Sequence, residues 1–127
     1  MERNHKNAKR GDPVLTIDAL NRFGADTKDG MSRCLNNEAM YLRLVVKALE
    51  NDNYDRLSSA VAAGDKKAAF EAAHAIKGMM GNLGLTPLYE LSSEMTEPLR
   101  AGKDADYADY LARILRQRET LLALCDD

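Results

Sequence analysis

Apolar residues recur at helical spacing along most of the chain. In the segment that begins at Asn37 they return every three or four positions, at Ala39, Leu42, Val46 and Leu49. Segments that alternate apolar and polar residues, as half-buried strands do, are missing, and β-branched and aromatic residues are few. The pattern predicts an all-α fold in which the helix that follows Asn37 is central.

The helical pattern weakens once inside this region. Asn51 to Asn53 interrupt it, and Tyr54, Leu57 and Val61 resume it up to Gly64. Two interpretations stay open, because residues 37–63 can form either one bent helix or two consecutive helices.

Capping residues and glycines mark the ends of two other predicted helices. A short helix is expected from Thr16, as N-cap, to Phe23, with Gly24 as its stop. A turn or second short helix is expected over 29–35. Asp65 reads as the N-cap of a longer helix from Lys66 to about Leu83, which Gly84 ends.

Two further helices complete the pattern. Thr86 and Pro87 are expected to open the first as N-cap and first-turn proline, and Pro98 to bend or fray its end. Its buried stripe is predicted to be Leu88, Leu91, Met95 and Leu99. The last helix is expected to start near Asp104 and to bury one face made of Tyr107, Leu111, Ile114, Leu121 and Leu124.

Short connections between long amphipathic helices favour antiparallel neighbours. We therefore predict an antiparallel four-helix bundle with one or two short N-terminal helices. A length of 127 residues suits one domain. We expect that domain to cover residues 14–127 and residues 1–13 to be a disordered polar tail, whose basic residues lie between Arg3 and Arg10.

Composition excludes several classes of protein. A formal net charge of −2 argues against a nucleic-acid reader. No stretch approaches the roughly 20 apolar residues of a membrane span, and the first residues lack the apolar segment of a signal peptide. We expect a cytoplasmic protein. Cys34 and Cys125 follow no CxxC spacing and are expected to be buried thiols.

The segment Phe70 to Gly84 contains His74, and its function depends on the direction in which that side chain points. At about 100° per residue, one face of the predicted helix is apolar, with Ala69, Ala72, Ala73, Ile76, Met79, Met80 and Leu83. His74 lies roughly 160° from the centre of that face and should therefore point to solvent. An imidazole in water is largely neutral at pH 7, so a ring nitrogen is free to act as a nucleophile.

Small and charged residues lie beside His74. Gly78 follows one turn later, Gly81 two turns later, and Lys77 lies on the flank. An interior glycine costs a helix about 1 kcal/mol relative to alanine. We interpret the two glycines as clearance for another macromolecule; the alternative is close helix packing. Phe70 fits two roles equally well, as an aromatic contact at the edge of a docking surface or as a residue flanking the core.

The segment AHAIKGMMGNLG, from Ala73 to Gly84, resembles the signature of histidine phosphotransfer domains. In that signature a histidine is followed after two residues by Lys-Gly and then, three residues on, by a small residue. The resemblance extends over residues 15–124. It implies that His74 is phosphorylated, that Lys77 stabilises the phosphate and that Gly78 gives steric access. Gly81 stands where the family commonly has alanine or serine.

The resemblance also implies a function. His74 would accept a phosphoryl group from an aspartyl phosphate of a receiver domain and pass it to another receiver aspartate, in two-component signal transduction. The partners would be receiver domains of response regulators or hybrid histidine kinases, which supply Mg²⁺, so no cofactor, no metal and no ATP-dependent kinase activity are expected in this chain. We expect a monomer whose docking surface includes Phe70, Glu71, Lys67, Gly81 and Asn82.

Two rival functions remain. Glu71 and His74 form an E-x-x-H pair, which is half of a di-iron carboxylate site, but the second histidine of the chain, His5, lies in the polar tail. The other rival is a helical module that docks receiver domains without accepting phosphate. No GxxxxGK[ST] loop is present for binding nucleotide phosphates.

Overall fold

The structure is a computed structural model that describes residues 15–125. The expected tail, with its basic cluster and His5, lies outside the described residues. Within them every regular element is a helix, which confirms the all-α prediction. In chain order the helices are α1 (Ile17–Phe23), α2 (Thr27–Ser32), α3 (Glu38–Leu49), α4 (Asn53–Ala63), α5 (Lys66–Asn82), α6 (Thr86–Arg100) and α7 (Tyr107–Cys125).

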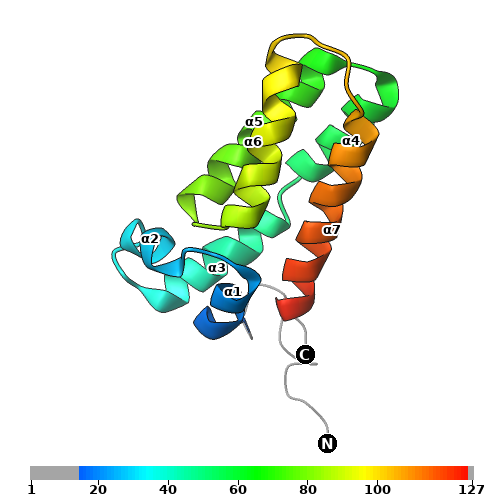
Figure 1. The fold of residues 1–127 in the computed structure, drawn as a ribbon. Coiled ribbons are helices and arrows are strands. Elements are labelled where there is room, and N and C mark those ends of the chain that lie inside the picture. The colour runs from blue at the N-terminus through cyan, green and yellow to red at the C-terminus, as the bar shows by residue number, and fades with distance from the viewer. Residues whose placement is uncertain (1–14, 126–127) are drawn as a thin grey trace, which may run out of the picture.

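Four helices form the bundle that carries the rest. α5 packs against α4 and α6, and α7 packs against α6 and α4, which closes the ring. Successive members run in opposite directions, and α1, α2 and α3 lie at one end (Figure 1). The predicted antiparallel bundle is confirmed, and its first helix is divided into α3 and α4.

The break between α3 and α4 settles the interpretation that the sequence left open. The Asn51 side chain accepts hydrogen bonds from the backbone and side-chain nitrogens of Asn53, at 2.9 and 2.8 Å. Such local bonds compete with a continuous helix. From α7, Arg118 donates to the Leu49 carbonyl at 2.6 Å and lies over the Tyr54 ring. The two helices are therefore separate and joined through α7.

Some helix ends differ from the prediction because side chains make other contacts. α2 begins before residue 29, since Asp26 caps it by accepting from the backbone of Asp29 at 3.0 Å. Thr86 is not the N-cap of α6: its hydroxyl donates to the Gly84 carbonyl, and Leu85 occupies the cap position. The predicted N-cap of α6 was therefore one residue too late in the chain.

The start of α7 was predicted too early. Asp104 forms an ion pair with Lys66 of α5 at 2.6 Å instead of opening the helix. Asp106 takes the capping role and accepts from the backbone of Asp109 at 3.0 Å. α6 continues past Pro98 and ends two residues later, at Arg100.

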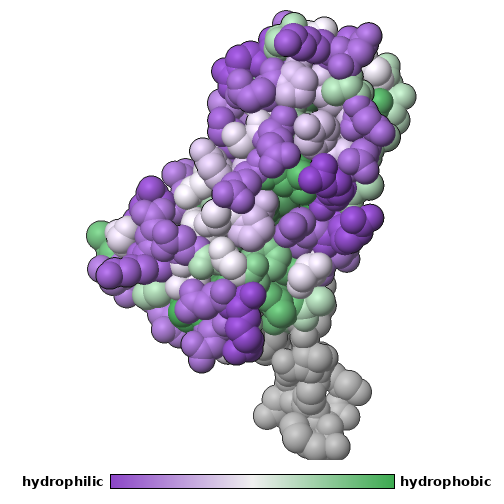
Figure 2. Space-filling view, viewed as in Figure 1, coloured by the Kyte–Doolittle hydropathy of each residue, from purple (hydrophilic) through white to green (hydrophobic). Residues whose placement is uncertain are grey.

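The core contains the predicted stripes. Leu88, Leu91, Met95 and Leu99 of α6 are buried, and so are the thiols Cys34 and Cys125, which form no disulfide. On α7 the predicted face is only partly enclosed, because Ile114 and Leu121 are buried while Tyr107, Leu111 and Leu124 are half-buried. Figure 2 shows apolar residues reaching the surface along the seam between α6 and α7. No helix of residues 15–125 has the length and apolar character to cross a bilayer.

The C-terminal end of α5 is closed by α2 and α3. Tyr41 donates its hydroxyl hydrogen to the Leu83 carbonyl at 2.7 Å in the core, and burial raises the pKa of Tyr41 to about 12, so this hydroxyl stays protonated. A Cβ on Gly30 would lie only 2.3 Å from the same carbonyl oxygen. Arg33 adds weaker bonds to the carbonyls of Gly81 and Asn82. Carbonyls that a helix end leaves without partners are thus satisfied.

Replacing Tyr41 with phenylalanine should destabilise the protein by about 1–2 kcal/mol, because the buried Leu83 carbonyl loses its O–H partner. Urea unfolding followed by circular dichroism measures the change. The control is Tyr110→Phe, since the Tyr110 hydroxyl makes no hydrogen bond with a described residue and should be removable at little cost. Equal losses in both variants would show that the Tyr41 bond does not secure this corner.

Candidate functional site

The site is built on α5, whose start is fixed by a side-chain cap. Asp65 accepts a hydrogen bond from the backbone of Ala68 at 3.0 Å. One face of the helix is buried against its neighbours, with Ala69, Ala72, Ala73, Ile76 and Met80. His74 lies on the other side and is exposed, as its angular position predicted.

The imidazole of His74 rests on an aromatic ring. Phe70, one turn earlier, stacks on it with ring centroids 5.5 Å apart and planes 14° apart. Phe70 is half-buried and packs against the core, and the guanidinium of Arg100 from α6 lies 5.2 Å from its ring centroid. Of the two roles considered for Phe70, the position flanking the core is confirmed, and the docking contact stays a prediction.

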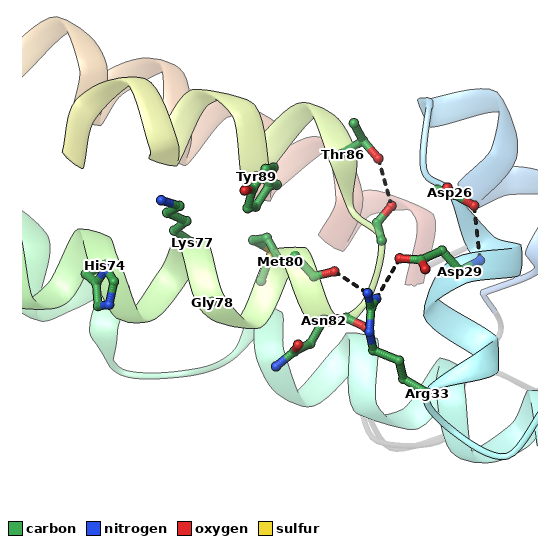
Figure 3. A pocket seen from close by; sticks show the side chains of 12 residues that line it. Asp26, Asp29, Arg33, His74, Lys77, Gly78, Met80, Asn82, Thr86 and Tyr89 are labelled. Atoms are coloured by element: carbon green, nitrogen blue, oxygen red, sulfur yellow. Dashed lines mark hydrogen bonds and ion pairs between the residues drawn. The ribbon is translucent and has the colours of Figure 1, made fainter. Parts of the chain in front are cut away.

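Lys77 supplies the cation beside the imidazole. Figure 3 shows its side chain on the flank of α5 that faces α6, one turn from His74. Within residues 15–125 no carboxylate pairs with it and no hydrogen bond holds it. Lys77 as a whole is half-buried, and an ammonium without a counter-charge among the described residues favours a nearby anion.

The two glycines of this face have different surroundings. A Cβ on Gly78 would meet nothing within 4 Å, so the helix surface next to His74 is open. A Cβ on Gly81 would lie 3.1 Å from two ring atoms of Tyr89 on α6. At Gly81 this contact agrees with the alternative interpretation, close packing between helices, whereas the open space at Gly78 agrees with clearance.

A groove of about 500 Å³ runs from His74 along α5 toward α2. Tyr89 and Thr86 of α6 line one side, and Asp29 of α2 and Arg33, the residue that caps the end of α2, close the far end (Figure 3). The Arg33 guanidinium is 2.6 Å from the Asp29 carboxylate, so its charge is balanced within the wall. The unpaired cation of the groove is therefore at the histidine end.

Of the remaining predicted residues, only one lines this groove. Lys67, Glu71 and Asn82 are all exposed, and Asn82 also lines the groove. Glu71 lies on the other flank, in a shallow depression shared with α4. In the part of the chain that the structure describes, no three His, Cys, Asp or Glu side chains come together as metal ligands.

Sequence reasoning missed several residues of the site, among them Arg33, Tyr89 and Arg100. A signal for the last two exists in the hairpin of α5 and α6. Phe70 and Arg100 lie at nearly equal distances along the chain from Gly84, and so do Gly81 and Tyr89. Antiparallel neighbours bring such positions together. Arg33 gave no comparable signal, because its contacts depend on how α2 folds back onto α5.

A family model described as the Hpt domain matches residues 40–126, which is more than half of the chain and includes all of α5. No curated protein and no solved structure matches the chain.

The two glycines should respond differently to a methyl group. Gly78→Ala should stabilise the protein by about 1 kcal/mol, because alanine favours the helix and its Cβ has open space. Gly81→Ala should gain less, since the Tyr89 ring must move. Thermal or urea unfolding gives both values. The difference should shrink when Tyr89 is also alanine; a difference that persists there would contradict the packing role of Gly81.

Proposed function

The chain belongs to the Hpt domain family, and on this premise we propose that it is a phosphorelay intermediate that carries its phosphoryl group on His74. Hpt domains are histidine phosphotransfer modules of phosphorelay signalling, have no kinase activity of their own and interact with receiver domains. The assignment of the role to His74 and the direction of each transfer are our proposal.

One observation carries this proposal. The His74 imidazole is exposed and lies on the outer face of α5, and no hydrogen bond or ion pair joins it to another described residue. Its ring nitrogens are thus free to react. The other histidine, His5, lies outside the described residues.

The proposed transfer is an in-line displacement. A ring nitrogen of neutral His74 uses its lone pair to form a bond to phosphorus, while the bond between phosphorus and the receiver's aspartate oxygen breaks. The aspartate leaves as a carboxylate, and the second ring nitrogen keeps its proton. In the next step another receiver's aspartate attacks the same phosphorus, and the imidazole leaves with its lone pair. Such transfers depend on positioning and charge stabilisation.

Two neighbours assist the reaction in this proposal. Lys77 has no counter-charge among residues 15–125, and its ammonium offsets the negative charge of the phosphoryl group. Gly78 leaves open the surface over which the receiver reaches the ring. Mg²⁺ comes with the receiver, so the chain itself needs no cofactor.

His74→Gln should abolish phosphate uptake and leave the melting temperature nearly unchanged, because an exposed side chain contributes little packing. Receiver domains encoded in the same genome are charged with radiolabelled acetyl phosphate and mixed with the protein. Label on the wild-type chain, absent from the variant, supports transfer. A stable complex without label would support the rival function, a module that only docks receivers. Lys103→Gln, an exposed change outside α5, is the control and should take up label normally.

Gly78→Leu should fold at least as stably as the wild type but slow the transfer at least tenfold, since the leucine side chain fills the open surface beside His74. Rapid mixing with a charged receiver measures the rate. Gly78→Ala separates bulk from helix stability: it should stabilise the helix and slow the transfer much less. Wild-type rates in the leucine variant would reject the role of Gly78 in access.

A further inference from the structure

We propose that Phe70 is a positioning residue for phosphotransfer: its ring, held by Arg100 from the neighbouring helix, fixes the orientation of the His74 imidazole. The inference rests on the proposed function of His74. It assigns a role to Phe70 and Arg100, in addition to the proposed roles of His74 as nucleophile, Lys77 as cation and Gly78 as open surface.

The stack has the geometry of an orienting contact. The ring planes are within 14° of parallel and the centroids are 5.5 Å apart, which is an offset stack between residues one helical turn apart. An exposed side chain on a helix otherwise exchanges between rotamers. Since His74 has no polar partner among the described residues, Phe70 is its principal source of order.

The support is itself fixed from two sides. Phe70 is half-buried and packs against the core, so its ring cannot swing freely. The Arg100 guanidinium lies 5.2 Å from the ring centroid, which is within the range of a cation–π contact. Arg100 is also 3.6 Å from Glu97, in the same turn of α6. The imidazole is thereby tied to the seam between α5 and α6.

A stack can orient the imidazole without using either of its ring nitrogens. The lone pair of an imidazole nitrogen lies in the plane of the ring and points away from its edge. A contact with the face of the ring restricts its orientation and leaves both nitrogens uncovered. Phe70 therefore aims the nucleophile without competing for its lone pair, and an aimed nucleophile reacts faster because less orientation is lost in the transition state.

The test compares three variants of the full chain. Phe70→Leu removes the aromatic ring and keeps an apolar side chain, whereas Phe70→Tyr keeps the ring. Phe23→Leu is the matched control, since it is the same change at a half-buried phenylalanine that lines a groove between α6 and α7, away from His74. Single-turnover transfer from a charged receiver is measured as a function of receiver concentration, which separates the maximal rate from the half-saturating concentration.

We expect Phe70→Leu to lower the maximal rate about tenfold and to leave the half-saturating concentration within twofold. Phe70→Tyr should return most of the rate, and Phe23→Leu should transfer as the wild type does. Proton NMR gives a second readout. An aromatic ring stacked on the His74 imidazole shifts the signals of the carbon-bound imidazole protons upfield. These signals should move downfield in Phe70→Leu only.

Each other outcome counts against the inference. An unchanged maximal rate in Phe70→Leu overturns it, and so does a change in the half-saturating concentration alone, which would make Phe70 a docking contact. Equal losses in Phe70→Leu and Phe23→Leu, with lowered melting temperatures, would reduce its role to stability. If the wild type takes no label from any receiver, the proposed function fails and this inference falls with it. If the wild type takes label, only the role of Phe70 is at stake.

Discussion

The burial of a single face of α5 is the constraint on which the site depends. The helix lies between α4 and α6, and small side chains at Ala69, Ala72 and Ala73 allow both neighbours to pack closely against it. Only one side of a helix can be enclosed in this way, so the opposite side must face water. His74 is exposed because of this geometry, and the residues one turn before and after it share its surface.

The sequence predicted the features that depend on local spacing. Periodic apolar residues and the Asp65 cap placed the start of α5 correctly, Gly64 marked the end of α4, and angular arithmetic gave the direction of His74. Features that depend on contacts between distant segments were missed or misplaced. The start of α7 shifted because Asp104 pairs with Lys66. The role of Gly81 could be recognised only once Tyr89 was known to lie against it.

Both the backbone of α5 and the His74 side chain on its exposed face are held by specific contacts. The backbone of α5 is fixed at both ends, by the Asp65 cap and by the hydrogen bond from Tyr41 to Leu83. Along the helix, the His74 ring stacks on Phe70, and Lys77 beside it has no ion-pair partner among the described residues. The fixed backbone of α5 thus presents the proposed nucleophile, stacked on an aromatic ring, next to the Lys77 ammonium that we propose meets the incoming anion.

The helix α7 stabilises the fold at a distance from the proposed site. α7 packs against α1, α3, α4 and α6 and lies across the ring of helices from α5. Through Arg118 it also joins the two halves of the divided first bundle helix. Substitutions along α7 can therefore change the stability of the domain without altering the surface around His74. During evolution, the stability of the domain and the properties of the proposed site can therefore change independently of each other.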